Sequence, residues 1–84
     1  MKLKKLLKVI DSHQYVRLVS TKGNVTKRSE VTRIDSSYFQ PLLESLGDYK
    51  VDLIRCVHDG LQLPENKDIL IIILKGGNDK WLKQ

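Results

Sequence analysis

Two side chains with metal-binding chemistry lie close together in the sequence, Cys56 and His58. Residues two apart on an extended strand project from the same face, so both side chains would point the same way. Cysteine and histidine are usual zinc ligands, and a structural zinc site needs four ligands, of which His13 could supply a third. The alternative is that Cys56 is a small buried hydrophobe and His58 a polar edge residue. We favour this alternative and expect no cofactor, with zinc as the minority possibility.

The sequence holds no arrangement typical of an enzyme. Asp11, Ser12 and His13 are neighbours along the chain, whereas the members of a catalytic triad are recognised by converging geometry. His58–Asp59 is similar to one part of a metal-dependent phosphohydrolase site, but such sites need further His and Asp ligands. Gly76–Gly77 lacks the spaced glycine and the Gly-Lys-Ser/Thr of a phosphate-binding loop. We therefore predict that the protein is not an enzyme.

Positive charge is concentrated in the first part of the chain. Nine basic and two acidic residues precede Ile34, six basic and eight acidic residues follow from Ile34 onward, and the net charge is +5. The basic N-terminal half favours an acidic partner such as nucleic acid, because Lys and Arg donate hydrogen bonds to phosphates. No helix-turn-helix, zinc-finger pattern or aromatic stacking platform accompanies the charge, and the alternative is a solvated surface. The candidate basic surface consists of Arg17, Lys22, Lys27, Arg28 and Arg33.

Two aromatic residues are candidate anchors for contact with another protein. Tyr49 lies at the start of a predicted strand and Trp81 lies near the C-terminus. Trp and Tyr are common at the centres of protein interfaces. The alternative for Trp81 is that it folds back over the sheet.

The first half of the chain predicts a helix followed by a hairpin. Leu3, Leu6, Leu7 and Ile10 recur at helical spacing, which predicts an amphipathic helix that ends near Asp11–Ser12. Residues 14–20 alternate and are rich in β-formers, so they predict a strand. Lys22–Gly23–Asn24 is typical of a turn, and a second strand is expected from Val25.

The second half repeats that order. Asp35–Ser36–Ser37 can cap a helix whose apolar face is Tyr38, Phe39, Leu42, Leu43 and Leu46, with Pro41 in the first turn and Gly47 as the cap at the end. Strands are predicted at 49–58 and 69–74. The hairpin turn between them lies at Asp59–Gly60 or at Pro64–Asn66, and in the second case Gly60 marks a bulge.

These elements predict an α+β fold, with two short helices packed on a small, mainly antiparallel sheet in the order α-ββ-α-ββ. Ile69–Leu74 is apolar at every position, so both faces of that strand should be buried. The helices cover one face. A loop, the C-terminal tail or a second copy of the protein must cover the other, which leaves a homodimer open.

Length and composition are those of one globular domain. The 84 residues predict a single domain at 1–84, with a polar tail at 78–84, and the single cysteine allows no intrachain disulfide. Lysines interrupt the apolar N-terminal residues, and the longest apolar run is far shorter than a membrane span. We expect a cytoplasmic protein without a membrane partner.

The opening Leu6–Leu7–Lys8–Val9–Ile10–Asp11–Ser12 with a strand at Tyr15–Val19 resembles small phage and prophage accessory proteins of Gram-positive bacteria. So does the closing pattern of a leucine-rich helix, Tyr49–Lys50–Val51–Asp52–Leu53–Ile54, Asp59–Gly60 and a β-branched last strand. The resemblance implies a regulator, an assembly accessory or an inhibitor of host defence acting in the host bacterial cytoplasm. Anti-CRISPR proteins are similar in size, although many are acidic mimics of DNA and this chain is basic.

The prediction from the sequence is thus a non-enzymatic binding protein that inhibits a host defence factor. The specific prediction is an anti-CRISPR protein that occludes a CRISPR effector nuclease. The alternative is a nucleic-acid-binding accessory protein that uses the basic N-terminal half.

Overall fold

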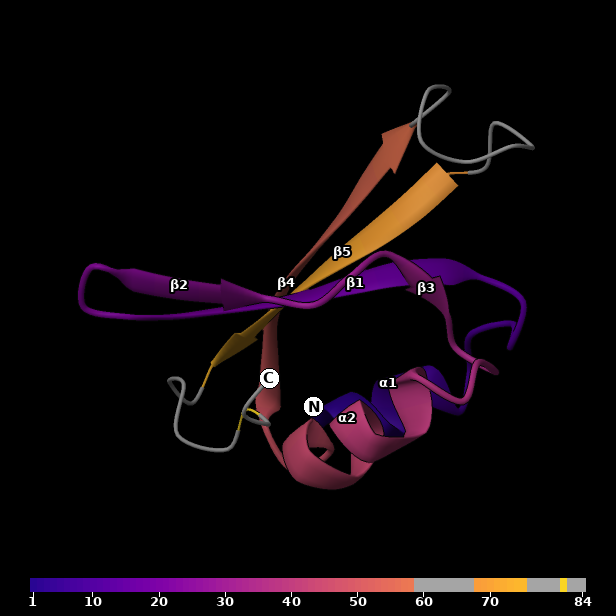
Figure 1. The fold of residues 1–84 in the computed structure, drawn as a ribbon, viewed down its shortest axis with the longest axis horizontal. Coiled ribbons are helices and arrows are strands. Elements are labelled where there is room, and N and C mark those ends of the chain that lie inside the picture. Colours follow the sequence, from indigo (N-terminus) through magenta and orange to yellow (C-terminus); the bar gives the residue numbers. More distant parts are fainter. Residues whose placement is uncertain (59–67, 76–80, 82–84) are drawn as a thin grey trace.

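The computed structural model describes residues 1–58, 68–75 and 81. Within these ranges the chain forms two helices and five strands, which confirms the predicted α+β class and element order and adds one short strand (Figure 1). In chain order they are α1 (Leu3–Leu7), β1 (Tyr15–Lys22), β2 (Val25–Arg28), β3 (Thr32–Arg33), α2 (Phe39–Leu46), β4 (Lys50–His58) and β5 (Asp68–Lys75).

The strands form one mixed sheet with β1 and β5 at its centre. The order is β2-β1-β5-β4, and β3 pairs with β1 beside that path. β1 and β5 are parallel, in a register that runs from Tyr15 opposite Ile69 to Ser20 opposite Leu74. The pairs of β1 with β2, β1 with β3, and β4 with β5 are antiparallel. The sheet is therefore mainly antiparallel as predicted, with one parallel pair at its centre.

β1 follows from the alternation in its sequence. Val16, Leu18 and Ser20 are buried, and the residues between them are half-buried. Gly23 has φ of 60° in the turn to β2, a conformation that glycine adopts without steric cost. The predicted hairpin of β1 and β2 is confirmed.

α2 begins at Phe39, whose backbone N–H donates to Oγ of Ser36 at 3.2 Å. The predicted cap cluster therefore supplies a hydroxyl to the first turn, and Pro41 lies in that turn without disturbing it. Phe39 is buried, whereas Tyr38 is exposed. Tyr38 does not belong to the buried face, because it precedes the first helical residue. The rest of that face is Leu42 and Leu46, which are buried, and Leu43, which is half-buried.

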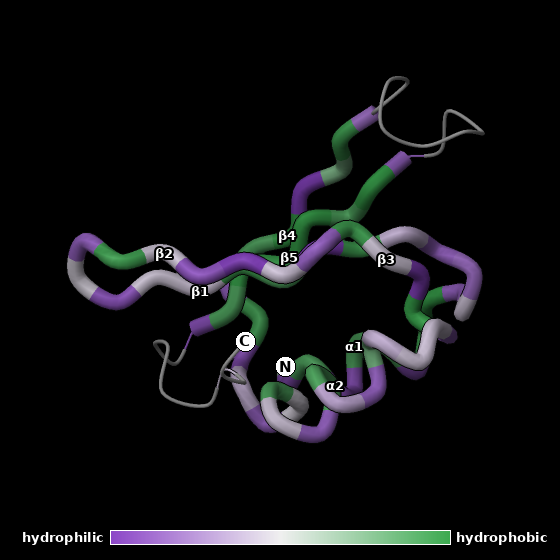
Figure 2. Tube along the Cα trace, viewed as in Figure 1, coloured by the Kyte–Doolittle hydropathy of each residue, from purple (hydrophilic) through white to green (hydrophobic). Residues whose placement is uncertain are grey.

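Both helices lie on one side of the sheet (Figure 1). They pack on Leu18 and Ile72, which are both fully buried at the sheet centre. Figure 2 shows that β5 is hydrophobic along most of its length. The sequence predicts that both faces of Ile69–Leu74 are buried, and the structure confirms this in part. Of these six residues, three are buried and three are half-buried.

The N-terminal segment is held against the link between α2 and β4. The backbone N–H of Leu3 donates to the carbonyl oxygen of Tyr49 at 2.8 Å, and that of Lys4 donates to Gly47 at 3.0 Å. α1 ends at Leu7, earlier than predicted, and Ile10 is only half-buried after it. The short helix therefore depends on these backbone contacts as well as on its apolar face.

Gly47 ends α2 as predicted, but in a right-handed conformation with φ of −58°. Its role is close packing. A Cβ at this position would lie 2.6 Å from the carbonyl oxygen of Leu43 and 3.4 Å from Cβ of Lys4. The absence of a side chain thus lets α1 approach α2.

Two predictions fall outside the described residues. The alternative turns at Asp59–Gly60 and Pro64–Asn66, with the bulge at Gly60, lie there, as does the tail at 78–84 apart from Trp81. Within the described ranges, a register shift in the β4–β5 pair occurs between Val51 and Leu53.

We predict that Gly47→Ala lowers the free energy of unfolding by about 1–3 kcal/mol, because the added methyl group overpacks a site with no room for it. Chemical denaturation followed by circular dichroism measures the loss. The control is Glu44→Ala on the exposed side of the same helix, which should change stability by about 0.5 kcal/mol or less. Equal effects of the two substitutions would contradict the packing role of Gly47.

Candidate functional site

The far part of β4 is exposed over its whole length. Every residue from Asp52 to His58 is exposed, although each belongs to a paired strand. Leu53, Ile54 and Val57 are 45%, 42% and 41% exposed. Figure 1 shows β4 and β5 running away from the helices beyond the sheet centre. The helices therefore leave this part of β4 without cover.

One face of the sheet is turned away from the helices, and we call it the open face. Val16, Leu18 and Ile72 point to the helices, so the residues that alternate with them point the other way. Arg17 of β1 and Arg55 of β4 both lie opposite Ile71 of β5, one on each side. The strand pairing assigns to the open face Tyr15, Arg17, Val19, Leu53, Arg55, Val57, Ile69, Ile71 and Ile73.

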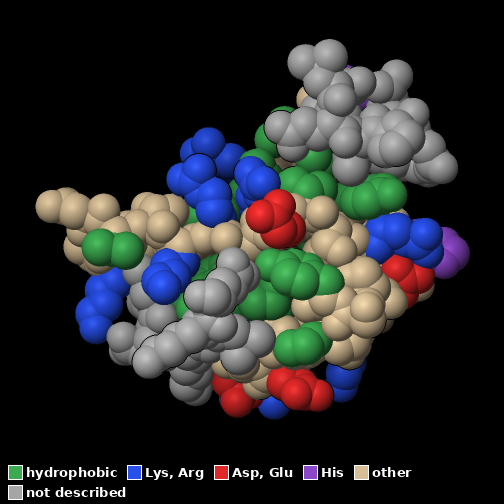
Figure 3. Space-filling view, in the orientation of Figure 1, with side chains coloured by type: hydrophobic (Ala, Val, Ile, Leu, Met, Phe, Trp, Pro, Cys, Tyr) green, Lys and Arg blue, Asp and Glu red, His purple; other side chains and the backbone are tan. Residues whose placement is uncertain are grey.

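The open face is basic. Arg28 lies opposite Val19 and joins Arg17 and Arg55 on this face. Arg17 donates from Nε to the carbonyl oxygen of Ser29 at 3.1 Å. In the described part of the chain, none of the three arginines forms an ion pair with a carboxylate. Figure 3 shows Lys and Arg side chains gathered above β1 and β2, with hydrophobic side chains beside them.

The predicted basic surface is divided by the fold. Arg17 and Arg28 share the open face. Lys27 lies opposite the buried Ser20, and Lys22 follows Ser20 by two residues, so both point to the helix side of the sheet. Arg33 donates to the carboxylate of Asp35 at 3.0 and 2.7 Å, which neutralises much of its charge.

The outer edge of β4 carries a backbone partner only at its start, as far as the structure describes it. Lys2 bridges Lys50, and the N–H of Val51 donates to the carbonyl oxygen of Met1 at 2.8 Å. Among the described residues no strand lies beyond Asp52–His58. The sheet's other edge is formed by the two-residue β3 and by β2, which has four residues and includes Lys27 and Arg28. Charged side chains protect an edge from unwanted pairing, so β4 is the less protected of the two.

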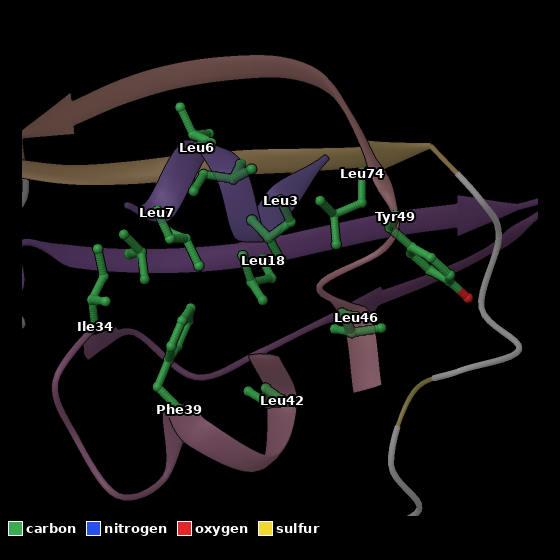
Figure 4. Packing of buried hydrophobic residues seen from close by; sticks show 12 residues of the cluster. Leu3, Leu6, Leu7, Leu18, Ile34, Phe39, Leu42, Leu46, Tyr49 and Leu74 are labelled. Atoms are coloured by element: carbon green, nitrogen blue, oxygen red, sulfur yellow. The ribbon is translucent and has the colours of Figure 1, made fainter. Parts of the chain in front are cut away.

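The two predicted aromatic anchors both pack inward. Tyr49 is 6% exposed and belongs to the hydrophobic core, where Figure 4 shows it beside Leu46 and Leu74. Its interpretation as an exposed anchor is therefore corrected. Trp81 is half-buried against the core, and its indole N–H donates to Oγ of Ser20, as the fold-back alternative predicted.

The three candidate metal ligands are exposed but do not form a cluster. Cys56 and His58 share a face of β4, yet Nδ1 of His58 lies 3.0 Å from Oδ1 of Asp68. Nε2 of His13 lies 3.6 Å from Oδ2 of Asp35. In the described ranges no group of three His, Cys, Asp or Glu side chains could hold a metal ion. Cys56 is exposed, so the alternative interpretation of Cys56 as a small buried hydrophobe is wrong.

Among the surface cavities that described residues form, two have mainly polar or charged linings. One, of about 310 Å³, is lined by Asp11, His13, Gln14, Tyr15 and Asp68. Gln14 Nε2 donates to the carbonyl oxygens of Tyr15 and Asp68 at 3.0 and 2.8 Å, so its amide ties β1 to β5. The other, of about 340 Å³, is lined by Met1, Lys2, Lys4, Lys5 and Lys50. Asp48 lies 2.8 Å from Nζ of Lys4 and 3.8 Å from that of Lys2, so part of this charge is neutralised.

Sequence reasoning did not single out Leu53, Arg55 and Val57. It placed them on a strand, and their alternation gives them one face. The sequence does not show that β4 is an edge strand. An identical pattern in a central strand would have a neighbouring strand on each side.

Comparisons with protein families, curated proteins and solved structures found no match to this chain. In the described ranges, neither helix is long and apolar enough to cross a membrane. The open face and β4 are therefore the features of the molecule that bear on its function.

We predict that the same substitution, Val to Thr, lowers stability in the core and has little effect on β4. Val57→Thr should change the free energy of unfolding by about 0.5 kcal/mol or less, because Val57 is exposed. Val16→Thr should cost about 1–3 kcal/mol, because it brings a hydroxyl into an apolar cluster. Urea denaturation of both variants measures the difference. A large loss at Val57 would mean that this side chain contributes to the fold and is not free for a partner.

Proposed function

We propose that this protein is a non-enzymatic binding protein that associates stoichiometrically with another protein through the open face and β4. One observation carries the proposal: Asp52–His58 is exposed at every position and includes three large hydrophobic residues. All seven belong to β4, and Leu53–His58 pair with β5 in a defined register, so their exposure is a property of a folded surface.

Exposed apolar strands are costly unless a partner covers them. Unpaired edge groups and apolar side chains promote association, and proteins usually block such edges with charge or cover. A contiguous apolar patch rimmed by polar residues marks an interaction site. Leu53 and Val57 lie on either side of Arg55 on the open face, and Arg is enriched in protein interfaces while Lys is depleted. The open face thus has the chemistry of a protein contact.

The specific partner we propose is a bacterial defence nuclease of the CRISPR effector class. Two features support it: the resemblance of the chain to small phage accessory proteins, and a surface that fits occlusion of a partner rather than catalysis. Arg17, Arg28 and Arg55 make the open face cationic. The inhibitor would therefore contact an acidic area of the nuclease and would not imitate DNA.

A second candidate is a nucleic-acid-binding accessory protein. The observation that favours it is the same group of three arginines, which could donate to phosphates. Tyr15 is the one aromatic side chain that the described strands assign to the open face. Because sequence-independent binding of single strands relies on several stacked aromatic side chains, we rank this candidate second.

We predict that the double variant Leu53→Thr/Val57→Thr binds the protein partner at least about tenfold more weakly, because anchors of this kind dominate interface energy. The assay is DNA cleavage by a panel of purified CRISPR effector nucleases at increasing molar ratio of this protein. Inhibition should saturate near one equivalent and should be lost in the double variant. The control Val25→Thr changes an exposed valine on β2 and should inhibit like the parent. Unchanged cleavage across the panel at large excess would remove the nuclease assignment.

The second candidate makes a different prediction. If phosphates bind the open face, Arg28→Glu/Arg55→Glu should abolish binding of a fluorescent single-stranded oligonucleotide, and the parent's affinity should fall steeply with salt. Lys22→Glu/Lys27→Glu, on the helix side, is the matched control. We expect no binding by the parent at physiological salt. Tight binding that fails only in the arginine variant would put the second candidate first.

A further inference from the structure

β4 is an edge strand, and from Asp52 to His58 its outer side has no neighbouring strand among the described residues. The hydrogen bonds of the neighbouring strands fix the direction of its backbone groups. The carbonyl oxygen of Asp68 accepts from the Gln14 side chain at the start of β1, so Asp68 points its carbonyl toward β1. Alternate residues of a strand point their backbone groups to opposite sides, so Ile69, Ile71 and Ile73 direct theirs toward β4. Their partners Leu53, Arg55 and Val57 are then the residues bonded to β5.

The remaining residues of β4 direct their N–H and C=O groups outward. These are Ile54, Cys56 and His58, which alternate with the bonded set. The N–H of Val51 supports this assignment, because it already points outward to the carbonyl oxygen of Met1, before the register shift. Ile54, Cys56 and His58 thus present a ladder of donors and acceptors that continues the edge already used at Val51.

We infer that the partner adds a β-strand to this outer edge, with a carboxylate opposite Arg55 and apolar side chains opposite Leu53 and Val57. The inference rests on the proposed function and deepens it by naming how the partner binds. Strand addition gives affinity through main-chain hydrogen bonds and specificity through alternate side chains. A carboxylate beside Arg55 would pair with a guanidinium that has no acidic partner among the described residues.

A second copy of the chain fits this edge poorly. Residues opposite each other in an antiparallel pair share a face, so a symmetric register that keeps Arg55 within the paired segment Leu53–Val57 puts it opposite Leu53, Arg55 or Val57. The register that aligns Leu53 with Val57 places the two Arg55 side chains directly opposite each other, which is destabilising. None of these registers gives Arg55 a carboxylate. Charge complementarity therefore selects an acidic strand from another protein.

The probe is a short synthetic strand, acetylated and amidated, with a central glutamate, threonine on each side of it, and valine two residues before and after it, so that the glutamate and both valines share a face. We expect it to bind the full chain and to shift the amide resonances of Ile54 and Cys56 most. A matched peptide with central lysine should bind on the order of tenfold more weakly. In the variant Arg55→Glu the preference should invert, and because Arg55 is exposed this variant should fold like the parent.

N-methylation of the probe tests the backbone contacts without changing the protein. Methylation of the probe amides that face β4 should abolish binding, whereas methylation of the alternate amides should leave it intact. Equal binding of both methylated peptides, equal binding of the glutamate and lysine peptides, or shifts confined to other strands would each overturn the inference. So would a concentration-dependent homodimer with its shifts on β4.

The inference and the proposed function can fail separately. If neither peptide binds but Leu53→Thr/Val57→Thr still loses nuclease inhibition, strand addition is wrong and protein binding through this surface stands. If the glutamate peptide binds but this double variant inhibits like the parent, the edge accepts strands and the proposed inhibitory surface is wrong.

Discussion

The parallel pairing of β1 with β5 is the interaction on which the rest of the structure depends. It joins two segments far apart in the chain, and its central pair, Leu18 and Ile72, is fully buried. β2 and β3 attach to the outer side of β1, β4 attaches to the outer side of β5, and both helices pack under this pair. Parallel strands cannot be joined by a tight turn, so everything between them has to form the crossover. The helix α2 is part of that crossover, which is why it lies on the face that the central pair buries.

The same arrangement explains why β4 is exposed. Two short helices can cover only a limited area, and they lie under β1 and the near part of β5 (Figure 1). Gly47 and the backbone contact from Lys4 fix α1 and α2 close to the start of β4. β4 then continues past them with its partner strand, and Asp52–His58 has no helix beneath it. The exposed strand is a direct consequence of a fold with more sheet than its helices can cover.

The sequence predicted the features that depend on local pattern and missed those that depend on distant contacts. Alternation identified β1, helical spacing identified α2, and Gly23 identified the first turn, because each signal lies within a few neighbouring residues. The parallel register of β1 with β5 has no local signal. Tyr49 illustrates the same limit, since its amphipathic side chain suits an interface, and its burial in the core depends on contacts with residues distant in the chain. The basic surface was identified by composition, and its division between two faces required the register of β2 with β1.

The two edges of the sheet differ in a way that bears on function. β2 is short and ends in Lys27 and Arg28, charges that oppose pairing with another strand. β4 is nine residues long, and its single lysine, Lys50, lies at the start, where Lys2 already occupies the outer side. The remainder carries Asp52 and Arg55, and Leu53 and Val57 are exposed beside these charges. The partner that we propose would cover Leu53 and Val57 on this edge, which has no neighbouring strand among the described residues.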